Sequence, residues 1–424
     1  MSEAATRRIA PAPGDNSAAA FDVARVRADF PILTQEVFGH PLVYLDSAAS
    51  AQKPRQVIEA MSHAYETCYA NVHRGVHRMS QLTTDAFESG RETVARFLNA
   101  SSADEIVFTR NATEAFNLLA NCFASVNLGH GDEVIISTLE HHANIVPWQL
   151  VRDRLGIVLR IVPIDDDGNF LLDAYEALLG PRTKLVAVTH VSNALGTVVP
   201  IKQVIERAHA RNVPVLVDGC QAMPHIKVDV QALDADFYVF TGHKLYGPTG
   251  IGVFYGKSEL LKDLPPYQGG GEMIASVTFE KTTFKPPPHR FEAGTPPIVE
   301  VIGLAAAIDY VQALGHDAIA AHENGLRSYA ETRLAQVPGL HIVGTAREKA
   351  SIVSFVMDSA HPHDIGTIVD RTGVAVRTGH HCAQPLMQRL GVAATARASF
   401  GVYNTRDEVD VLAQALESVH EIFG

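Results

Sequence analysis

Lys244 stands where a side-chain amine could react with an aldehyde. It lies in the segment 241–250 (TGHKLYGPTG), shortly after the apolar run 237–240, which is typical of a buried strand. An amine held at the edge of a buried sheet can act as a nucleophile towards a carbonyl group. Taken alone, the segment favours a surface lysine in a Gly/Pro turn, so the interpretation depends on the groups that accompany it.

The apolar run 106–108 ends in a segment that suits a phosphate group. Asn111, Ala112 and Thr113 follow this run and open a helical pattern. The first N–H groups of a helix are free and its dipole favours an anion, and Thr113 adds a hydroxyl group. For this segment alone, an ordinary N-cap is the favoured alternative.

Two other apolar runs end in groups that could contact an aromatic ligand. His141 follows the run 134–136, and its imidazole could stack on a flat ring or bind a metal. Asn193 follows the run 185–188 within the segment THVSN.

Asp218 directly follows the apolar run 213–217 and precedes Gln221. A carboxylate in this place is costly to bury unless a cation accompanies it, and a protonated ring nitrogen is such a cation. A carboxylate that caps the next turn is the alternative. Together the five run ends offer a phosphate seat, a stacking imidazole, an acid for a ring nitrogen, an amide donor and an amine. Pyridoxal phosphate held as a Schiff base needs this set of groups.

Cys382 is the cysteine whose neighbours most favour its thiolate form. It lies in the segment 376–383 (VRTGHHCA), close to Arg377, His380 and His381. Positively charged neighbours stabilise a thiolate. The alternatives are a buried structural cysteine and a metal site. Adjacent ligands fit tetrahedral zinc poorly and the chain has no Cys-x-x-Cys pair, so we predict no metal site.

Arg397 is an isolated charge in the small, apolar stretch 396–399. Its guanidinium could bind a substrate carboxylate through two parallel hydrogen bonds. An internal ion pair is the alternative.

These groups can meet only if the strands that carry them end at one edge of a sheet. The five runs are continuously apolar, as strands buried on both faces of a parallel sheet are. Helical patterns, such as 113–125 and 202–211, lie between them. The alternation predicts an α/β fold with a doubly wound, mainly parallel sheet, whose ligands bind beyond the carboxyl ends of the strands.

The length of 424 residues predicts one large and one smaller domain. Composition and pattern predict a mobile tail over 1–20 and an N-terminal segment over 21–40 that packs with the small domain. They further predict a large ligand-binding domain over 41–300 and a small α+β domain over 301–424.

Composition excludes several classes of protein. The net charge of −12 argues against a nucleic-acid partner, and no apolar run approaches the roughly 20 residues that a membrane span needs. Pro11 and Pro13 interrupt the place where a signal peptide needs an apolar stretch, and four separated cysteines indicate reduced thiols. We therefore expect a cytoplasmic enzyme with no membrane partner.

Several of these segments closely resemble the SufS-like cysteine desulfurases, a group of the class V aminotransferase family. The matching segments span most of the chain: EHHANIVPWQ (140–149), THVSNALG (189–196), VDGCQA (217–222), FYVFTGHKLYGPTGIG (237–252), RFEAGT (290–295) and VRTGHHCA (376–383). The resemblance implies the PLP-dependent transferase fold of type I. One departure is PIVE at 297–300, which leaves the small end of the implied substrate pocket less defined.

The resemblance also implies which residues hold pyridoxal 5'-phosphate. Lys244 matches the lysine that links covalently to it, Asp218 the partner of its ring nitrogen, and Gln221 the donor to its phenolic oxygen. His141 matches the stacking residue and acid or base. The remaining implied contacts are Ala112, Thr113, Thr241, His243 and, supplied by the second subunit of a homodimer, Thr295.

On the substrate side, Asn193 and Arg397 match a carboxylate clamp, and Cys382 matches the sulfur acceptor. His73, Arg74 and Arg377 match positions near the pocket whose roles are less defined. The segment 269–274 resembles a loop that reaches the partner's active site.

The implied reaction converts L-cysteine to L-alanine and leaves a persulfide on Cys382. A SufE-like or SufU-like protein would accept the sulfur, and iron–sulfur cluster assembly would use it. A selenocysteine lyase acting on L-selenocysteine with the same scaffold is the alternative.

Overall fold

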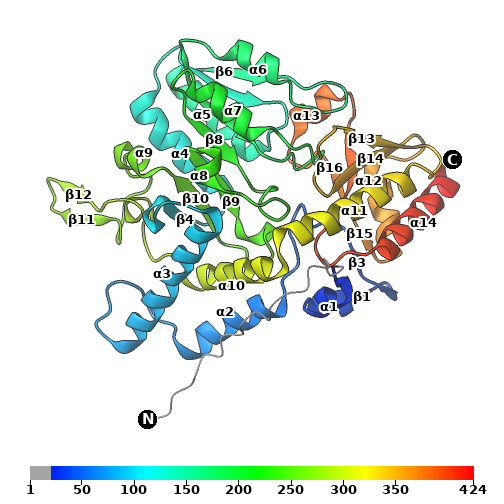
Figure 1. Cartoon of the computed structure of the whole chain (residues 1–424), viewed down its shortest axis with the longest axis horizontal. Helices are drawn as coiled ribbons and strands as arrows, with labels where there is room; N and C mark the ends of the chain where they lie inside the picture. The colour runs from blue at the N-terminus through cyan, green and yellow to red at the C-terminus, as the bar shows by residue number, and fades with distance from the viewer. Residues whose placement is uncertain (1–20) are drawn as a thin grey trace, which may run out of the picture.

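A seven-stranded sheet forms the centre of the computed structural model, which describes residues 21–424 (Figure 1). The predicted tail at 1–20 lies outside the described residues. Every pairing in this sheet is parallel except those of β10, which runs antiparallel to both its neighbours. The predicted mainly parallel sheet is confirmed. The strands, in spatial order, are β4 (Ile106–Thr109), β10 (Gly252–Gly256), β9 (Phe237–Thr241), β8 (Val215–Asp218), β7 (Thr183–Thr189), β5 (Glu133–Ser137) and β6 (Val158–Val162).

The apolar runs are continuous because successive side chains enter two different cores. In β9, Tyr238 and Phe240 belong to one buried cluster, whereas Phe237 and Val239 belong to another. Side chains alternate between the two faces of a strand, so a sheet covered on both faces requires apolar residues at every position.

Two strands of the central sheet, β6 and β10, were not found in the sequence analysis. In β6, Val158 and Ile161 are exposed and Arg160 lies between them, so this strand at the end of the sheet has no continuous apolar run. β10 (GVFYG) is a short buried strand between glycines that directly follows the Gly/Pro turn.

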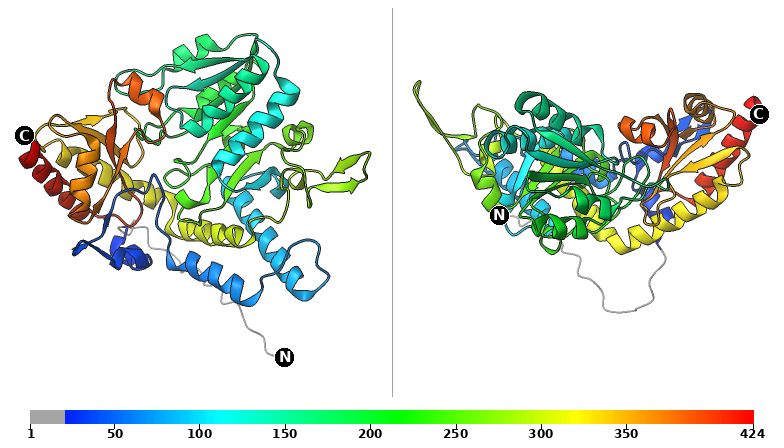
Figure 2. Two further views of the ribbon diagram at one scale, coloured as in Figure 1. Left: turned by 180° about the vertical axis from the view of Figure 1, so that it is seen from behind. Right: turned by 90° about the horizontal axis from the view of Figure 1, so that it is seen from above.

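Helices cover both faces of the sheet (Figures 1 and 2). The predicted helices at 113–125 and 202–211 are present as α4 (Ala112–Asn127) and α7 (Ile201–His209). The others in this part of the chain are α2 (Arg55–Thr67), α3 (Arg78–Leu98), α5 (Val146–Leu155), α6 (Leu172–Leu178), α8 (Val230–Leu233), α9 (Ser258–Asp263) and α10 (Ile298–Leu314).

The C-terminal region has its own antiparallel sheet and its own core (Figure 2, right). The strands, in spatial order, are β13 (Leu340–Val343), β14 (Ile352–Met357), β17 (Thr395–Ser399) and β16 (Arg377–Gly379). Its helices are α11 (His316–Leu334), α12 (Pro362–Asp370), α13 (Gln384–Arg389) and α14 (Arg406–Phe423). A short strand from the start of the chain, β3 (Val43–Tyr44), pairs with β15 (Val374–Ala375) beside this sheet.

The N-terminal segment joins the two regions. Helix α1 (Val23–Ala28) places Arg27 against Glu408 of α14, with 2.8 Å between Nη1 and Oε1. The Phe30 ring packs edge-on against Tyr246 from the central region and against Tyr403. A two-residue hairpin of β1 (Glu36–Val37) and β2 (His40–Pro41) follows.

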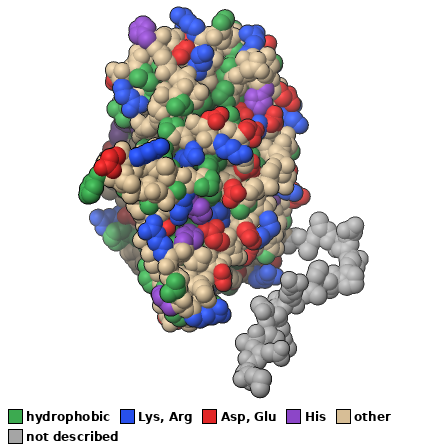
Figure 3. Space-filling view, turned by 90° about the vertical axis from the view of Figure 1, so that its left-hand side faces the viewer, with side chains coloured by type: hydrophobic (Ala, Val, Ile, Leu, Met, Phe, Trp, Pro, Cys, Tyr) green, Lys and Arg blue, Asp and Glu red, His purple; other side chains and the backbone are tan. Residues whose placement is uncertain are grey.

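A hairpin of β11 (Ile274–Val277) and β12 (Thr282–Phe284) projects from the central region (Figure 1). It carries the exposed apolar side chains of Val277, Phe279 and Phe284. The face on this side of the molecule has basic and acidic side chains interspersed (Figure 3).

Within residues 21–424, no single helix is both long and apolar enough to cross a membrane; α10 and α11, which meet at 78°, reach that threshold only together.

Candidate active site

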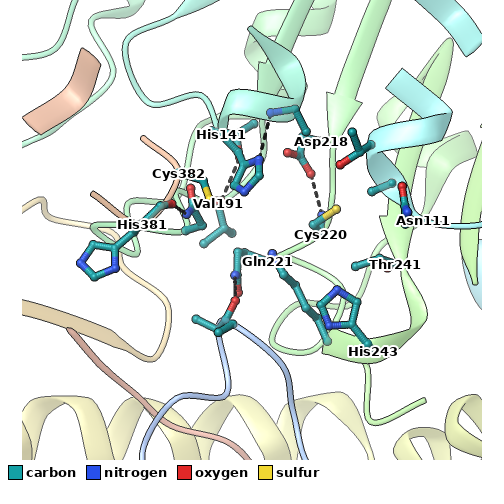
Figure 4. A pocket seen from close by; sticks show the side chains of 18 of the residues that line it. Asn111, His141, Val191, Asp218, Cys220, Gln221, Thr241, His243, His381 and Cys382 are labelled. Carbon is teal, nitrogen blue, oxygen red and sulfur yellow. Dashed lines mark hydrogen bonds between the residues drawn. The ribbon is translucent and has the colours of Figure 1, made fainter. Parts of the chain in front are cut away.

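A pocket opens between the carboxyl ends of the central strands and the C-terminal sheet (Figure 4). In the figure, Cys382 lies beside His141, whereas Asn111, Thr241 and His243 lie towards the opposite side. The predicted site residues that line it are Ala112, Thr113, His141, Asn193, Asp218, Gln221, Thr241, His243, Lys244, Arg377, Cys382 and Arg397.

Lys244 reaches the pocket because β9 ends at Thr241 and the chain turns at once into the short helix η4 (Gly242–Lys244). The His243 carbonyl accepts hydrogen bonds from the Ala51 N–H at 3.0 Å and from Lys53 Nζ at 3.1 Å. His243 Nδ1 lies 3.2 Å from the Ser50 hydroxyl. The segment 50–53, which is distant in sequence, therefore fixes the position of His243, the residue before Lys244.

Asp218 ends β8 as a buried carboxylate with no cationic side chain hydrogen-bonded to it in the described structure. The Cys220 N–H donates to its Oδ1 at 2.9 Å. Burial raises the pKa of Asp218, and the nearby charge of Lys244 opposes that rise. Gly219 permits this turn, since a Cβ there would lie 2.0 Å from the Tyr238 ring.

His141 lines the pocket as a neutral imidazole. Burial, and next the charge of Lys244, lower the pKa of His141 to about 3. Its Nδ1 accepts the Ala143 N–H at 3.0 Å, which leaves the proton on Nε2.

The residue before His141 anchors this segment in the protein interior. Glu140 is fully buried and accepts hydrogen bonds from the Asn144 amide at 2.7 Å, the Thr189 N–H at 3.1 Å and the Ser137 hydroxyl. Burial raises the pKa of Glu140 to about 8.

Helix α4 begins at the pocket and can receive an anion. The Asn111 side chain caps the helix by accepting the Glu114 N–H at 2.9 Å. The amides of the first helical turn have no partner within a helix, and the dipole favours negative charge there. Ala112 and Thr113 belong to this turn and line the pocket, as does Thr241.

Arg397 and Asn193 lie together at the pocket, and Arg397 also forms the internal ion pair that was the alternative. Their role as a substrate clamp stays a prediction. Arg397 Nη1 donates to the Asn193 carbonyl at 2.7 Å, and Nη2 donates to Asp46 at 3.1 Å. Arg397 Nε and Asn193 Oδ1 are buried and have no partner within the described residues. Arg377 is the register partner of Arg397 on the adjacent strand, so two guanidinium-bearing residues stand side by side at the pocket.

Cys382 lies in the connection between β16 and α13, after a turn that runs through left-handed backbone conformations. His381 has φ 52° and Cys382 has φ 55°. The Asn193 side-chain amide donates to the His381 carbonyl at 2.5 Å, and His381 Nε2 lies 2.8 Å from the Thr395 hydroxyl.

Three predicted site residues lie outside this pocket. Thr295 lines a separate cavity with Arg110 and Glu114. His73 Nε2 lies 2.7 Å from Glu88, and Arg74 pairs with Glu272 at 2.5 Å. The implied contributions of these three residues to a pocket, including the supply of Thr295 by a second subunit, stay predictions.

The structure adds residues that the sequence analysis did not assign. Cys220 is buried and lines the pocket next to Asp218, and burial raises the pKa of its thiol well above the usual value. Ala48 enters from the segment after β3, and its carbonyl accepts the Gln221 side-chain amide at 2.6 Å. Ala48 follows none of the five apolar runs, whereas Cys220 lies between the assigned residues Asp218 and Gln221 and had no role in the predicted chemistry. Among residues 21–424, no group of three or more His, Cys, Asp or Glu side chains is arranged to hold a metal ion.

The model of the aminotransferase class-V family matches residues 43–412, which is most of the chain. The chain belongs to the aminotransferase class-V family. It has the PLP-dependent transferase fold of type I, as predicted.

Relatives within this family are similar over nearly the whole chain. A cysteine desulfurase from Dickeya dadantii is 53% identical over 95% of this chain and 98% of its own length. A cysteine desulfurase from Synechococcus elongatus is 51% identical over 98% of this chain. The chain spans only 66% of that relative, and only 58% of a probable cysteine desulfurase from Mycolicibacterium paratuberculosis.

Solved structures give the same result. A crystal structure of the cysteine desulfurase CsdA from Escherichia coli superposes with a TM-score of 0.89 at 40% identity, over 96% of this chain and all of that one. A cysteine desulfurase from Thermococcus onnurineus NA1 has the same TM-score at 39% identity, over 94% of this chain and 98% of that one.

The residues present fit the cofactor that the fold implies. A buried carboxylate without a cationic hydrogen-bond partner, the start of a capped helix and an amine line one pocket. These are the groups that a cationic ring nitrogen, a phosphate and an aldehyde require.

Proposed function

We propose that the protein is a SufS-like cysteine desulfurase that converts L-cysteine to L-alanine and collects the sulfur as a persulfide on Cys382. The observation that carries the proposal is the convergence of Lys244, Asp218 and Cys382 on one pocket. These residues bring together an amine that can react with a carbonyl, an acid for a ring nitrogen and a thiol. This combination suits the removal of a sulfur atom from a bound amino acid.

Pyridoxal phosphate, when bound, supplies a carbonyl group that captures the substrate amine and a cationic ring that withdraws electrons from it. Lys244 would link to it, Asp218 would hold its ring nitrogen, and Gln221 its phenolic oxygen. The α4 start with Thr113, together with Thr241 and His243, would hold its phosphate. His141 would cover the ring.

The unpartnered edge of Arg397 binds the substrate carboxylate. Nη1 and Nη2 already hold Asn193 and Asp46, which fixes the plane of the guanidinium, while Nε is free to donate. A planar, fixed guanidinium loses little entropy when it binds a carboxylate. Asn193 and Arg377 complete the polar wall beside it.

Lys244 and Cys382 have separate roles in the reaction. Lys244, which would hold the cofactor, would also move protons at the substrate carbons. The Cys382 thiolate attacks the substrate sulfur: the carbon–sulfur bond breaks, a sulfur–sulfur bond forms, and a proton is added to the carbon that becomes the alanine methyl group. His141, neutral and with its proton on Nε2, is placed to assist these transfers.

The partners follow from the same proposal. The persulfide passes to a SufE-like or SufU-like protein for iron–sulfur cluster assembly, and the enzyme works as a homodimer in the cytoplasm. Four free cysteines support a reducing compartment. The selenocysteine lyase alternative is not favoured, because the relatives quoted above are named cysteine desulfurases.

The test is to incubate the enzyme with L-cysteine without oxygen, to measure alanine and to locate the persulfide by mass spectrometry. We expect alanine to form with the persulfide on Cys382, and Cys382→Ser to lower alanine formation by roughly 100-fold or more. Cys68→Ser is the matched control, since Cys68 lies outside the pocket. Near-normal turnover by Cys382→Ser would reject the assignment.

A further inference from the structure

Two hydrogen bonds join His142 to the chain segment that carries Cys382. The His142 N–H donates to the Cys382 carbonyl at 2.7 Å. The Gln384 N–H donates to His142 Nε2 at 3.0 Å. His142, which belongs to the central region, therefore binds the backbone of the turn at Cys382 and at Gln384.

The turn at Cys382 needs such support because of its backbone conformation. Both His381 and Cys382 have positive φ values, and neither is glycine. L-residues with side chains are strained in this conformation, and it persists only where the surroundings hold it. Asn193 and Thr395 bind His381. The bonds of His142 act on the following residues, Cys382 and Gln384.

His142 is itself on a fixed support. It begins the short helix η3 (His142–Asn144), directly after His141. Both ends of this segment are fixed, since Glu140 is fully buried and Asn144 donates to it while accepting the Trp148 ring N–H at 3.0 Å. In this segment Glu140 thus lies in the protein core, His141 lines the pocket, and His142 contacts the Cys382 turn.

We propose that His142 is a positioning residue that holds the Cys382 turn against the pocket. The holding of the turn rests on the geometry alone, whereas its effect on turnover rests on the proposed function. His142 touches neither substrate nor cofactor in this scheme; it acts through the position of Cys382.

The ring bond also makes the turn sensitive to acid. Nε2 can accept the Gln384 N–H only while it carries no proton. Burial, and next the charge of His380, lower the pKa of His142, and His141 lies on its other side with 6.3 Å between ring centroids. The bond is therefore present at neutral pH and is lost as the pH falls below the range in which an ordinary histidine titrates.

Hydrogen exchange of the holoenzyme, read by mass spectrometry over residues 380–386, tests the proposal. Loss of one hydrogen bond predicts that His142→Ala exchanges the Gln384 amide roughly five- to tenfold faster at pH 7.5. His142→Gln, which can place an oxygen near the position of Nε2, should restore most of the protection. It should also keep that protection as the pH is lowered to the point at which the wild-type enzyme loses it.

His380→Gln is the matched control. The His380 ring is adjacent to the turn and makes no hydrogen bond within residues 21–424, so its replacement should leave the Gln384 amide protected. Unchanged exchange in His142→Ala, or equal loss of protection in His380→Gln and His142→Ala, would overturn the proposal.

A second measurement separates this proposal from the proposed function. The rate at which iodoacetamide alkylates Cys382 should rise about three- to tenfold in His142→Ala, because a freed turn exposes the thiol. Alanine formation should fall in kcat while KM for L-cysteine changes little, since the Arg397 site is untouched. If exchange and alkylation change while turnover does not, the positioning role stands and its effect on turnover fails; Cys382→Ser tests the sulfur acceptor separately. If neither exchange nor alkylation changes, the positioning role fails whatever the turnover.

Discussion

The two walls of the pocket are built in different ways. The wall that would hold the cofactor is built around the ends of buried strands: Asp218 and Thr241 are the last residues of β8 and β9, and the sheet behind them fixes both. The wall that carries Cys382 is a strained turn held by individual hydrogen bonds from Asn193 and His142. A cofactor must stay in place throughout turnover, whereas a sulfur carrier must move. The difference in construction matches that difference in task.

The largest loss of activity should come from removing the reactive amine of Lys244, which belongs to the wall that would hold the cofactor (the rigid wall). Lys244→Ala should lower alanine formation by roughly 1,000-fold or more, because no other described lysine lines the pocket. The visible absorbance of the covalently linked cofactor should vanish at the same time. Lys257→Ala is the control, since Lys257 pairs with Asp234 and Asp236 outside the pocket. An absorbance band that survives in Lys244→Ala would contradict the assignment.

The next largest effect should come from the buried carboxylate. Asp218→Asn keeps the side-chain volume and an acceptor for the Cys220 N–H but removes the negative charge. Leaving a buried cation without its partner costs about 3 kcal/mol or more, so kcat should fall at least roughly 100-fold. Steady-state kinetics measure the fall in kcat, and the dissociation constant of the cofactor shows whether binding also weakens.

Asp236→Asn is the matched control for that change. Asp236 is also buried, but it pairs with His209 and Lys257 outside the pocket. Its loss should lower stability and leave the cofactor absorbance unchanged. Equal kinetic losses in the two variants would show that burial, and not the position at the pocket, determines the effect.

A smaller effect is expected at the substrate clamp, where Arg397 lies on β17 of the C-terminal sheet. Arg397→Lys keeps the charge but loses the planar fork. Loss of a hydrogen bond to a charged group costs about 1.5–3 kcal/mol, so KM for L-cysteine should rise roughly 10- to 150-fold. The cofactor absorbance should not change. A KM within twofold of the wild-type value would place the carboxylate elsewhere.

The smallest effect on turnover should come from Glu140→Gln. Its main expected effect is on how the stability of the protein depends on pH. The folded protein holds a proton on Glu140 up to about pH 8, because burial raises its pKa, whereas the unfolded chain releases that proton near the usual glutamate pKa of 4.5. Stability from the neutral carboxyl is therefore fully present below about pH 4.5 and is lost as the pH rises to about 8. The slope is at most about 1.4 kcal/mol per pH unit.

Glu140→Gln removes this titration. We expect the free energy of unfolding, measured with urea between pH 5 and 8, to decline less with rising pH in the variant than in the wild-type enzyme. Parallel curves would show that Glu140 is ionised throughout this range.

The sequence predicted the rigid wall well because its residues follow a general rule. Strands such as β9 are apolar at every position, so their ends can be found, and parallel strands bring those ends to one edge. Ala48 was missed because it lies far from the ends of the central strands in the sequence and reaches the pocket only where its segment folds back. Cys220 was missed although it lies only two residues after the end of β8, because the predicted chemistry gave it no role. His142 was visible only as the neighbour of His141, since its hydrogen bonds to residues 382 and 384 depend on the relative placement of two regions of the chain.

Arg377 and Arg397 are opposite each other on neighbouring strands of the C-terminal sheet. Two like charges opposite each other weaken a strand pair, and an anion bound between them reverses the sign of that interaction. The small sheet should consequently melt at a higher temperature when an amino acid occupies the pocket. Ligand binding would then stabilise the pairing of β16 with β17, and β16 is the strand that leads into the turn that carries Cys382.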